Sequence, residues 1–155
     1  MSPTPDQAAA AIKALNDLIQ TCKDGEKGFQ SAAAAVKTPR LGALFGQYSR
    51  QRGLFARQLQ AAVRRLDGEP RTNGSLGGTL QRSWVNFRAL ASGKDNEDGV
   101  IAACERGEDG ALKAYEEALA ADLPLDIRAT VQAQYAEVQK VHEHIRALEG
   151  AHDTQ

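Results

Sequence analysis

The chain has few aromatic residues, which argues against a fold built on β-sheets. Phe, Trp and Tyr make up 5% of the 155 residues, whereas the hydrophobic share is 42%. Strands favour aromatic and β-branched side chains, but much of the apolar fraction here is alanine, which favours helices. A chain of this length usually forms one domain with one core. The composition therefore predicts an all-α protein with a single domain over residues 1–155.

Three further absences limit the expected partners and location. The formal net charge is only -1, so overall charge indicates neither a nucleic acid nor an anionic membrane as partner. No apolar run is long enough to span a bilayer, and the first residues, MSPTPDQAAA, lack the basic and apolar blocks of a secretory signal. Two cysteines do not make a disulfide framework. We therefore expect a soluble, cytoplasmic protein.

Apolar residues recur at three- and four-residue steps along four long segments, as expected for amphipathic helices. Prolines and turn residues separate these segments, because proline cannot continue a helix. The predicted helices run over about 5–37, over 39–66, from about 95 until the LPLD stretch at 123–126 breaks the third, and over about 125–148. A helical hairpin (about 5–66), a crossover (about 67–93) and a second hairpin (about 95–149) follow from this. The crossover is expected to contain a short amphipathic helix, at about 75–90, with Trp84 and Phe87 as its largest side chains.

One motif, Cys-x-x-Gly-Glu-x-Gly, occurs at 22–28 and again at 104–110. The shift of 82 residues also pairs Ile19 with Ile101, which indicates that the two hairpins are internal duplicates. Two hairpins joined by a long connection make a four-helix bundle with a crossover. Glu26 and Glu108 fall in the apolar stripes of their helices, so both are predicted to point inward.

Several segments resemble a known family. They read LNDLIQTCKDGEKGF, SRQRGLFARQLQ, GTLQRSW, CERGEDGALKAYEEAL, LP and VQKVHEHI, and together they extend over nearly the whole chain after the first ten residues. In these segments the chain resembles the DUF2383 family (also called the PA2169 family) of bacterial four-helix bundles, within the ferritin-like superfamily. The resemblance implies a ferritin-like fold and raises the question of a di-metal site at the bundle centre.

A ferritin-like di-metal site would use iron or manganese held by glutamates of two helices and Glu-x-x-His on the other two. The candidate metal ligands here are Glu26, Glu108 and His142. Gln139 replaces the carboxylate three residues before His142, and no Asp, Glu or His occurs between Leu41 and Leu66. The ligand set is therefore incomplete, and we expect no cofactor unless this degenerate site takes iron or manganese.

Arg52 falls in the inward stripe where a cation would bind. An arginine cannot be deprotonated in a protein, but its planar fork can hold a carboxylate through two hydrogen bonds. We therefore predict a buried polar layer in place of a metal centre. Its expected members are Glu26, Glu108, Arg52, Gln134 and Tyr48, with His142 as a further candidate.

Three classes of function are compatible with these residues. The first is a non-catalytic bundle that acts by association, as a homo-oligomer (a dimer) or with a protein partner; the family resemblance suggests a stress setting. The second is a metal-binding oxidoreductase or metal store with a degenerate site. The third is a redox protein that uses Cys22 and Cys104, although inward cysteines are more often core residues. No catalytic residue, nucleophile–base pair or phosphate-binding loop is recognisable.

Overall fold

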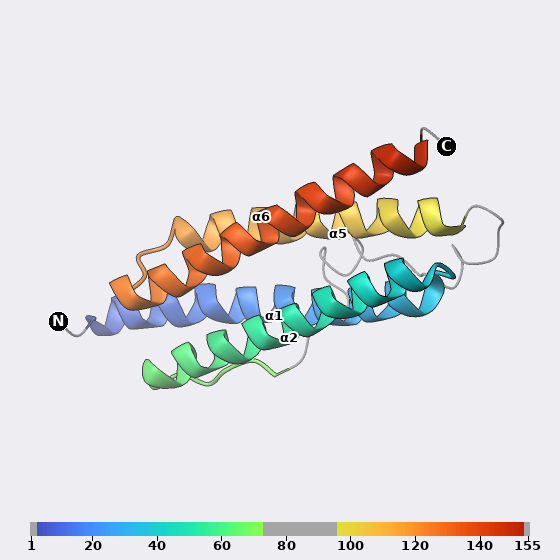
Figure 1. Cartoon of the computed structure of the whole chain (residues 1–155). Helices are drawn as coiled ribbons and strands as arrows, with labels where there is room; N and C mark the ends of the chain where they lie inside the picture. The colour runs from blue at the N-terminus through green and yellow to red at the C-terminus, as the bar shows by residue number, and fades with distance from the viewer. Residues whose placement is uncertain (1–2, 73–95, 154–155) are drawn as a thin grey trace.

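A computed structural model describes residues 3–72 and 96–153 of the chain. Within these ranges all regular structure is helical, and the predicted four-helix bundle is confirmed (Figure 1). The short helix predicted at 75–90, with Trp84 and Phe87, lies outside the described residues. The four helices are α1 (Pro5–Ala35), α2 (Pro39–Arg65), α5 (Asn96–Leu119) and α6 (Leu125–Asp153).

The two hairpins lie side by side, α1 with α2 and α5 with α6 (Figure 1). They meet mainly where α1 packs on α5, whereas the backbones of α2 and α6 approach each other at few positions. Among the described helices, α2 thus packs mainly on α1. Within the described residues, none of the helices combines the length and the hydrophobicity that crossing a membrane needs.

Capping residues set the start of α1. The Thr4 hydroxyl accepts a hydrogen bond from the Gln7 backbone N–H (3.1 Å), and the Gln7 side chain accepts one from the Thr4 N–H (3.0 Å). This reciprocal pair satisfies two N–H groups that a helix start leaves without helical partners. Pro5 occupies the first helical position, where its missing N–H costs nothing.

The turn between α1 and α2 is tied to the start of α5. Thr38 makes no side-chain cap for α2; instead, the Glu97 carboxylate accepts hydrogen bonds from the backbone N–H groups of Lys37 (2.9 Å) and Thr38 (2.7 Å). Glu97 also accepts one from the Thr38 hydroxyl (2.8 Å). One side chain therefore fixes one end of the second hairpin against the turn of the first.

A Schellman motif ends α2. The Gly68 N–H donates to the Val63 carbonyl (3.0 Å) and the Asp67 N–H to the Arg64 carbonyl (2.9 Å). Asp67 holds the left-handed conformation, with φ 62°, that glycine more often fills. Gly68 lies against α1, and a Cβ there would come within 2.8 Å of Ile12 Cδ1. The turn thus lets the chain leave α2 in close contact with α1.

The apolar core consists of two clusters along the bundle. One joins α1, the C-terminal half of α2, the end of α5 and the start of α6, and includes Leu15, Leu59 and Val131. The other joins the C-terminal half of α1, the start of α2, the start of α5 and the later part of α6, and includes Phe29 and Ile101. Fully buried polar side chains lie at the level where these clusters meet.

Candidate functional site at the bundle centre

Arg52 of α2 and Glu108 of α5 form a buried ion pair between the two hairpins. Arg52 Nη1 lies 2.5 Å from Glu108 Oε1, and Arg52 Nη2 donates to Glu108 Oε2 at 2.8 Å. The side chains are 1% and 0% exposed. Two parallel N–H···O bonds of this kind are the strongest arrangement available to an arginine and a carboxylate. The charge of Glu108 is thus matched by one partner, and both of its oxygens are occupied.

Aromatic and amide groups complete the surroundings of Arg52. Its guanidinium carbon lies 5.4 Å from the centre of the Phe29 ring, within the range of a cation–π contact. Its Nε donates to Gln51 Oε1 at 3.3 Å. Burial lowers the pKa of the guanidinium, but the charge and hydrogen bonds of Glu108 more than offset this, so the pKa of Arg52 is raised overall. The arginine therefore stays charged at any physiological pH.

A second polar chain runs beside this pair. The Tyr115 hydroxyl donates to Gln134 Oε1 (2.8 Å) and lies 3.2 Å from Cys22 Sγ. Because the tyrosine proton is used on Gln134, the Cys22 thiol is the donor in that contact. Gln134 in turn donates to Gln58 Oε1 (2.8 Å) and to the Phe55 carbonyl. The chain links α1, α5, α6 and α2 through one continuous set of hydrogen bonds.

The structure places Glu26 differently from the predicted layer. Its side chain is 29% exposed and its Oε1 lies 3.1 Å from Lys23 Nζ. Its other oxygen lies against Gly53 of α2, in the space that a Cβ would occupy. Glu26 therefore leaves the bundle centre through the room that a glycine provides. A single arginine at this level neutralises one carboxylate, and burying a second would leave its charge unmatched.

Tyr48 is also separate from the ion pair. Its ring packs edge-on against Phe29, with centroids 5.4 Å apart, and its hydroxyl lies 2.6 Å from His144 Nδ1. Burial is the main reason why the pKa of Tyr48 is raised to about 12, and the nearby Glu108 charge adds to it. Of the five residues predicted to form one layer, all except Glu26 are buried, but only Arg52 and Glu108 are hydrogen-bonded to each other.

Both cysteines are buried and free. Burial raises the pKa of the Cys22 thiol to about 11. Burial, followed by the Glu108 charge, also raises the pKa of Cys104. Since the thiolate is the reactive form, both thiols are held in their unreactive state near neutral pH.

His142, the third predicted metal ligand, has its hydrogen-bond partner on α5. Its Nε2 is 2.6 Å from Asp109 Oδ1, and its side chain is 13% exposed. Glu105 lies one helical turn before Asp109, and one ligand atom from each of these three side chains lies within 4.8 Å of the others. Sequence reasoning missed Glu105 and Asp109, although their four-residue spacing places both on one face of α5.

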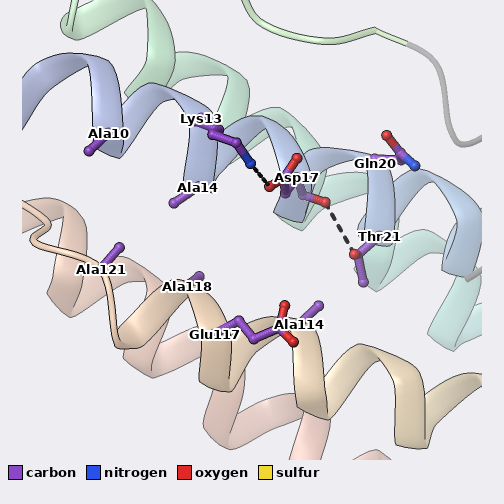
Figure 2. Close-up of a pocket in the computed structure, with 10 residues that line it drawn as sticks. All are labelled: Ala10, Lys13, Ala14, Asp17, Gln20, Thr21, Ala114, Glu117, Ala118 and Ala121. Carbon is purple, nitrogen blue, oxygen red and sulfur yellow. Dashed lines mark hydrogen bonds and ion pairs between the residues drawn. The ribbon is translucent and has the colours of Figure 1, made fainter. Parts of the chain in front are cut away.

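A shallow groove of about 440 Å³ separates α1 and α5 on another face of the bundle (Figure 2). Small alanines from both helices approach each other across it, among them Ala14 and Ala118. The charged Asp17 beside it is paired with Lys13 at 3.1 Å, and its backbone carbonyl accepts from the Thr21 hydroxyl. Among the residues that line this groove there is no nucleophile beside a base, so it lacks a catalytic constellation.

Comparison with known proteins decides the family. The family model described as "Domain of unknown function (DUF2383)" matches residues 10–121. The chain belongs to the DUF2383 family. Comparison with curated proteins found no match. Among solved structures, the chain is similar to a mutant of Dps1 from Mycobacterium smegmatis, with a TM-score of 0.78 and 16% identity over 95% of this chain and 99% of that one. At this identity the likeness shows the fold, which is ferritin-like.

A ferritin-like fold raises the question of a metal at the bundle centre, and the residues of this DUF2383 chain do not fit one. Both oxygens of Glu108 accept from Arg52, whose fixed charge would repel a cation at that position. The Glu26 carboxylate pairs with Lys23, and His142 with Asp109. The three predicted ligands thus have three different partners and offer no shared coordination site.

Proposed function

We propose that this DUF2383 protein is a non-catalytic helical bundle that acts by association with further copies of itself. The non-catalytic role is supported by the Arg52–Glu108 pair, a bidentate contact between α2 and α5 that occupies the bundle centre. Within the described residues, this pair leaves neither oxygen of the Glu108 carboxylate free for a metal or a substrate. The buried cysteines, with raised pKa values, do not support a redox function.

The exposed face of α2 supports association with further copies of the chain. Arg50, Arg57 and Arg64 follow one another at intervals of seven residues, and all three are exposed. None of them forms an ion pair with another residue in the described part of the chain. Leu54 lies between the first two and is 45% exposed. This stripe combines positive charge with apolar surface, as protein contacts often do.

The matching acidic surface is on the other hairpin. Exposed carboxylates of α5 and α6 include Glu117 and Glu143, whereas α2 has no Asp or Glu at all. A basic stripe on one hairpin and acids on the other favour contact between two copies of the same chain. The aromatic residues of α2 are all buried, so this arginine stripe offers no exposed ring on which a base could stack, which argues against a nucleic acid as partner.

The test is the mass of the full-length protein in solution, measured by light scattering over a range of protein and salt concentrations. We expect a dimer or larger assembly at low salt, with an association constant at least tenfold lower in Arg57→Glu. Arg146→Glu, an exposed charge reversal on α6, is the matched control and should leave the mass unchanged. A monomer under all conditions would contradict the association.

The non-catalytic half is tested by metal analysis of protein purified without chelator. Near-stoichiometric iron or manganese that disappears in Glu26→Gln or Glu108→Gln would overturn it and would favour a metal store or oxidoreductase. A metal content that is the same in these two variants as in the unaltered protein would be consistent with the non-catalytic role.

A further inference from the structure

The cluster of Glu105, Asp109 and His142 differs from the closed centre because, in the described part of the chain, no Lys or Arg forms an ion pair with its carboxylates. Glu105 and Asp109 are one turn apart on α5, and His142 lies opposite on α6. The donor atoms lie within 4.8 Å of one another. Two carboxylate oxygens and one imidazole nitrogen form a three-ligand set of the type that first-row divalent cations take.

We propose that this cluster binds a divalent first-row cation, such as Zn²⁺, on the outside of the bundle and thereby links α5 to α6. The proposal does not depend on the proposed function, since none of the three ligands belongs to the Arg52–Glu108 pair. With a neutral imidazole the three side chains carry two negative charges, which a divalent cation would balance.

The burial of His142 distinguishes this site from a group of freely exposed acidic side chains. Its side chain is 13% exposed, whereas that of Asp109 is 60% exposed. The imidazole is therefore held in place by the packed helices and presents Nε2 toward the α5 carboxylates. A preorganised nitrogen suits cation capture, because the exposed Asp109 and the partly exposed Glu105 can adjust around a fixed first ligand.

The distances need only small side-chain movements to fit an ion. Ligand atoms about 2.0–2.2 Å from a tetrahedral zinc stand roughly 3.3–3.6 Å apart. The distance between His142 Nε2 and Asp109 Oδ1, now 2.6 Å, would increase to admit the ion. Ligand atoms that are now as far apart as 4.8 Å would move closer together. Both helices can keep their backbone positions, since rotation of Glu105 and Asp109 suffices. Water would complete the coordination.

Titration of the metal-free full-length protein with Zn²⁺, followed by calorimetry and by thermal unfolding, tests the site. We expect one ion per chain and a rise in Tm with Zn²⁺. Glu105→Gln and His142→Gln should each weaken binding at least tenfold and abolish the rise in Tm. Glu105 is partly exposed, so its variant should fold normally even if the His142 variant does not. Mg²⁺ at the same concentration should have little effect, because imidazole favours the first-row metals.

Two controls make the result specific. Glu143→Gln changes an exposed acid next to His142 in sequence and should leave the affinity unchanged. Glu26→Gln removes the acid predicted at the bundle centre and should also have no effect. Binding that survives both Glu105→Gln and His142→Gln, or the lack of binding below about 1 mM Zn²⁺, would overturn the proposal. Loss of binding in Glu26→Gln would place the ion at the bundle centre, and this would contradict both the present proposal and the proposed non-catalytic function. A failure of the present proposal alone would leave Glu26→Gln without effect.

Discussion

The two copies of Cys-x-x-Gly-Glu-x-Gly have the same sequence frame but different surroundings. Glu108 of the second copy is fully buried and holds Arg52 with both oxygens. Glu26 of the first is 29% exposed, pairs with Lys23 and lies against Gly53. The two copies therefore share a helix and its apolar stripe. The burial and the pairing of the glutamate in each copy depend instead on the residue that faces it from another helix.

The partner helices are where the two halves diverge. The residue 82 positions after Arg52 is Gln134, and the residue 82 positions after Gly53 is Tyr135. At these two equivalent positions, therefore, only the first hairpin has a guanidinium and a glycine. One positive charge matches one carboxylate. The other carboxylate has an exit toward water, where its charge costs little.

The largest effect that tests this comparison is expected when one partner of the ion pair is removed. Arg52→Met should destabilise the protein by about 3–5 kcal/mol, because Glu108 would be left buried and unpaired. Glu26→Gln should cost less than about 1 kcal/mol, since its pair with Lys23 is partly exposed. Urea unfolding of the two variants measures both values.

Replacement of both partners sharpens the same point. Arg52→Met combined with Glu108→Leu should recover most of the lost stability, because an apolar pair of similar volume avoids the desolvation cost. A double variant as unstable as Arg52→Met alone would show that the pair acts through something other than charge matching.

Alkaline pH should reveal the burial of Cys22 in the first motif. The pKa of this thiol is about 11 in the folded protein, against 9.0 for an ordinary cysteine. Between these values the unfolded chain loses the proton while the folded chain keeps it, so stability is full below pH 9 and falls as the pH rises to 11. The loss is about 2–3 kcal/mol.

Urea unfolding between about pH 8 and pH 11 should therefore show a smaller decline in Cys22→Ala than in the unaltered protein. The sign would be reversed if the thiolate were stabilised by the fold. Equal declines in the two proteins would mean that Cys22 does not contribute to this pH dependence.

The hydroxyl of Tyr115 gives a smaller effect. Tyr115→Phe removes the group between Cys22 Sγ and Gln134 Oε1 and leaves both without that partner in a buried place. We expect a cost of about 1–3 kcal/mol. The control is Tyr135→Phe, whose exposed hydroxyl donates to Glu116, and which should change the free energy of unfolding by less than about 0.5 kcal/mol.

The smallest effect concerns the glycine beside Glu26. Gly46→Ala has room for its methyl group and should stabilise α2 by about 0.5–1 kcal/mol through helix propensity. Gly53→Ala should yield less, because its methyl group would displace the Glu26 carboxylate from the place it now occupies. Equal gains in thermal unfolding would show that Glu26 moves away freely.

The sequence by itself determined the long helices of the described ranges, their approximate ends and the bundle they form. Those properties depend on the spacing of apolar residues such as Ile19 and Ile101 and on prolines such as Pro39 and Pro124, which act over a few neighbouring residues. The inward place of Arg52 and Glu108 also follows from that spacing, and the observed helix ends differ from the expected ones by only a few residues.

Only the tertiary structure decided which polar groups meet. The stripes of α1 and α5 indicate that Glu26 and Glu108 both face inward, but they cannot say that Arg52 reaches Glu108 alone, or that Gly53 opens a path for Glu26. His142 was expected near both glutamates and instead faces Asp109 and Glu105. Which side chains pair depends on contacts between residues that lie tens of positions apart in the sequence. Charge, burial and the space between helices determine these contacts, and helical periodicity does not report them.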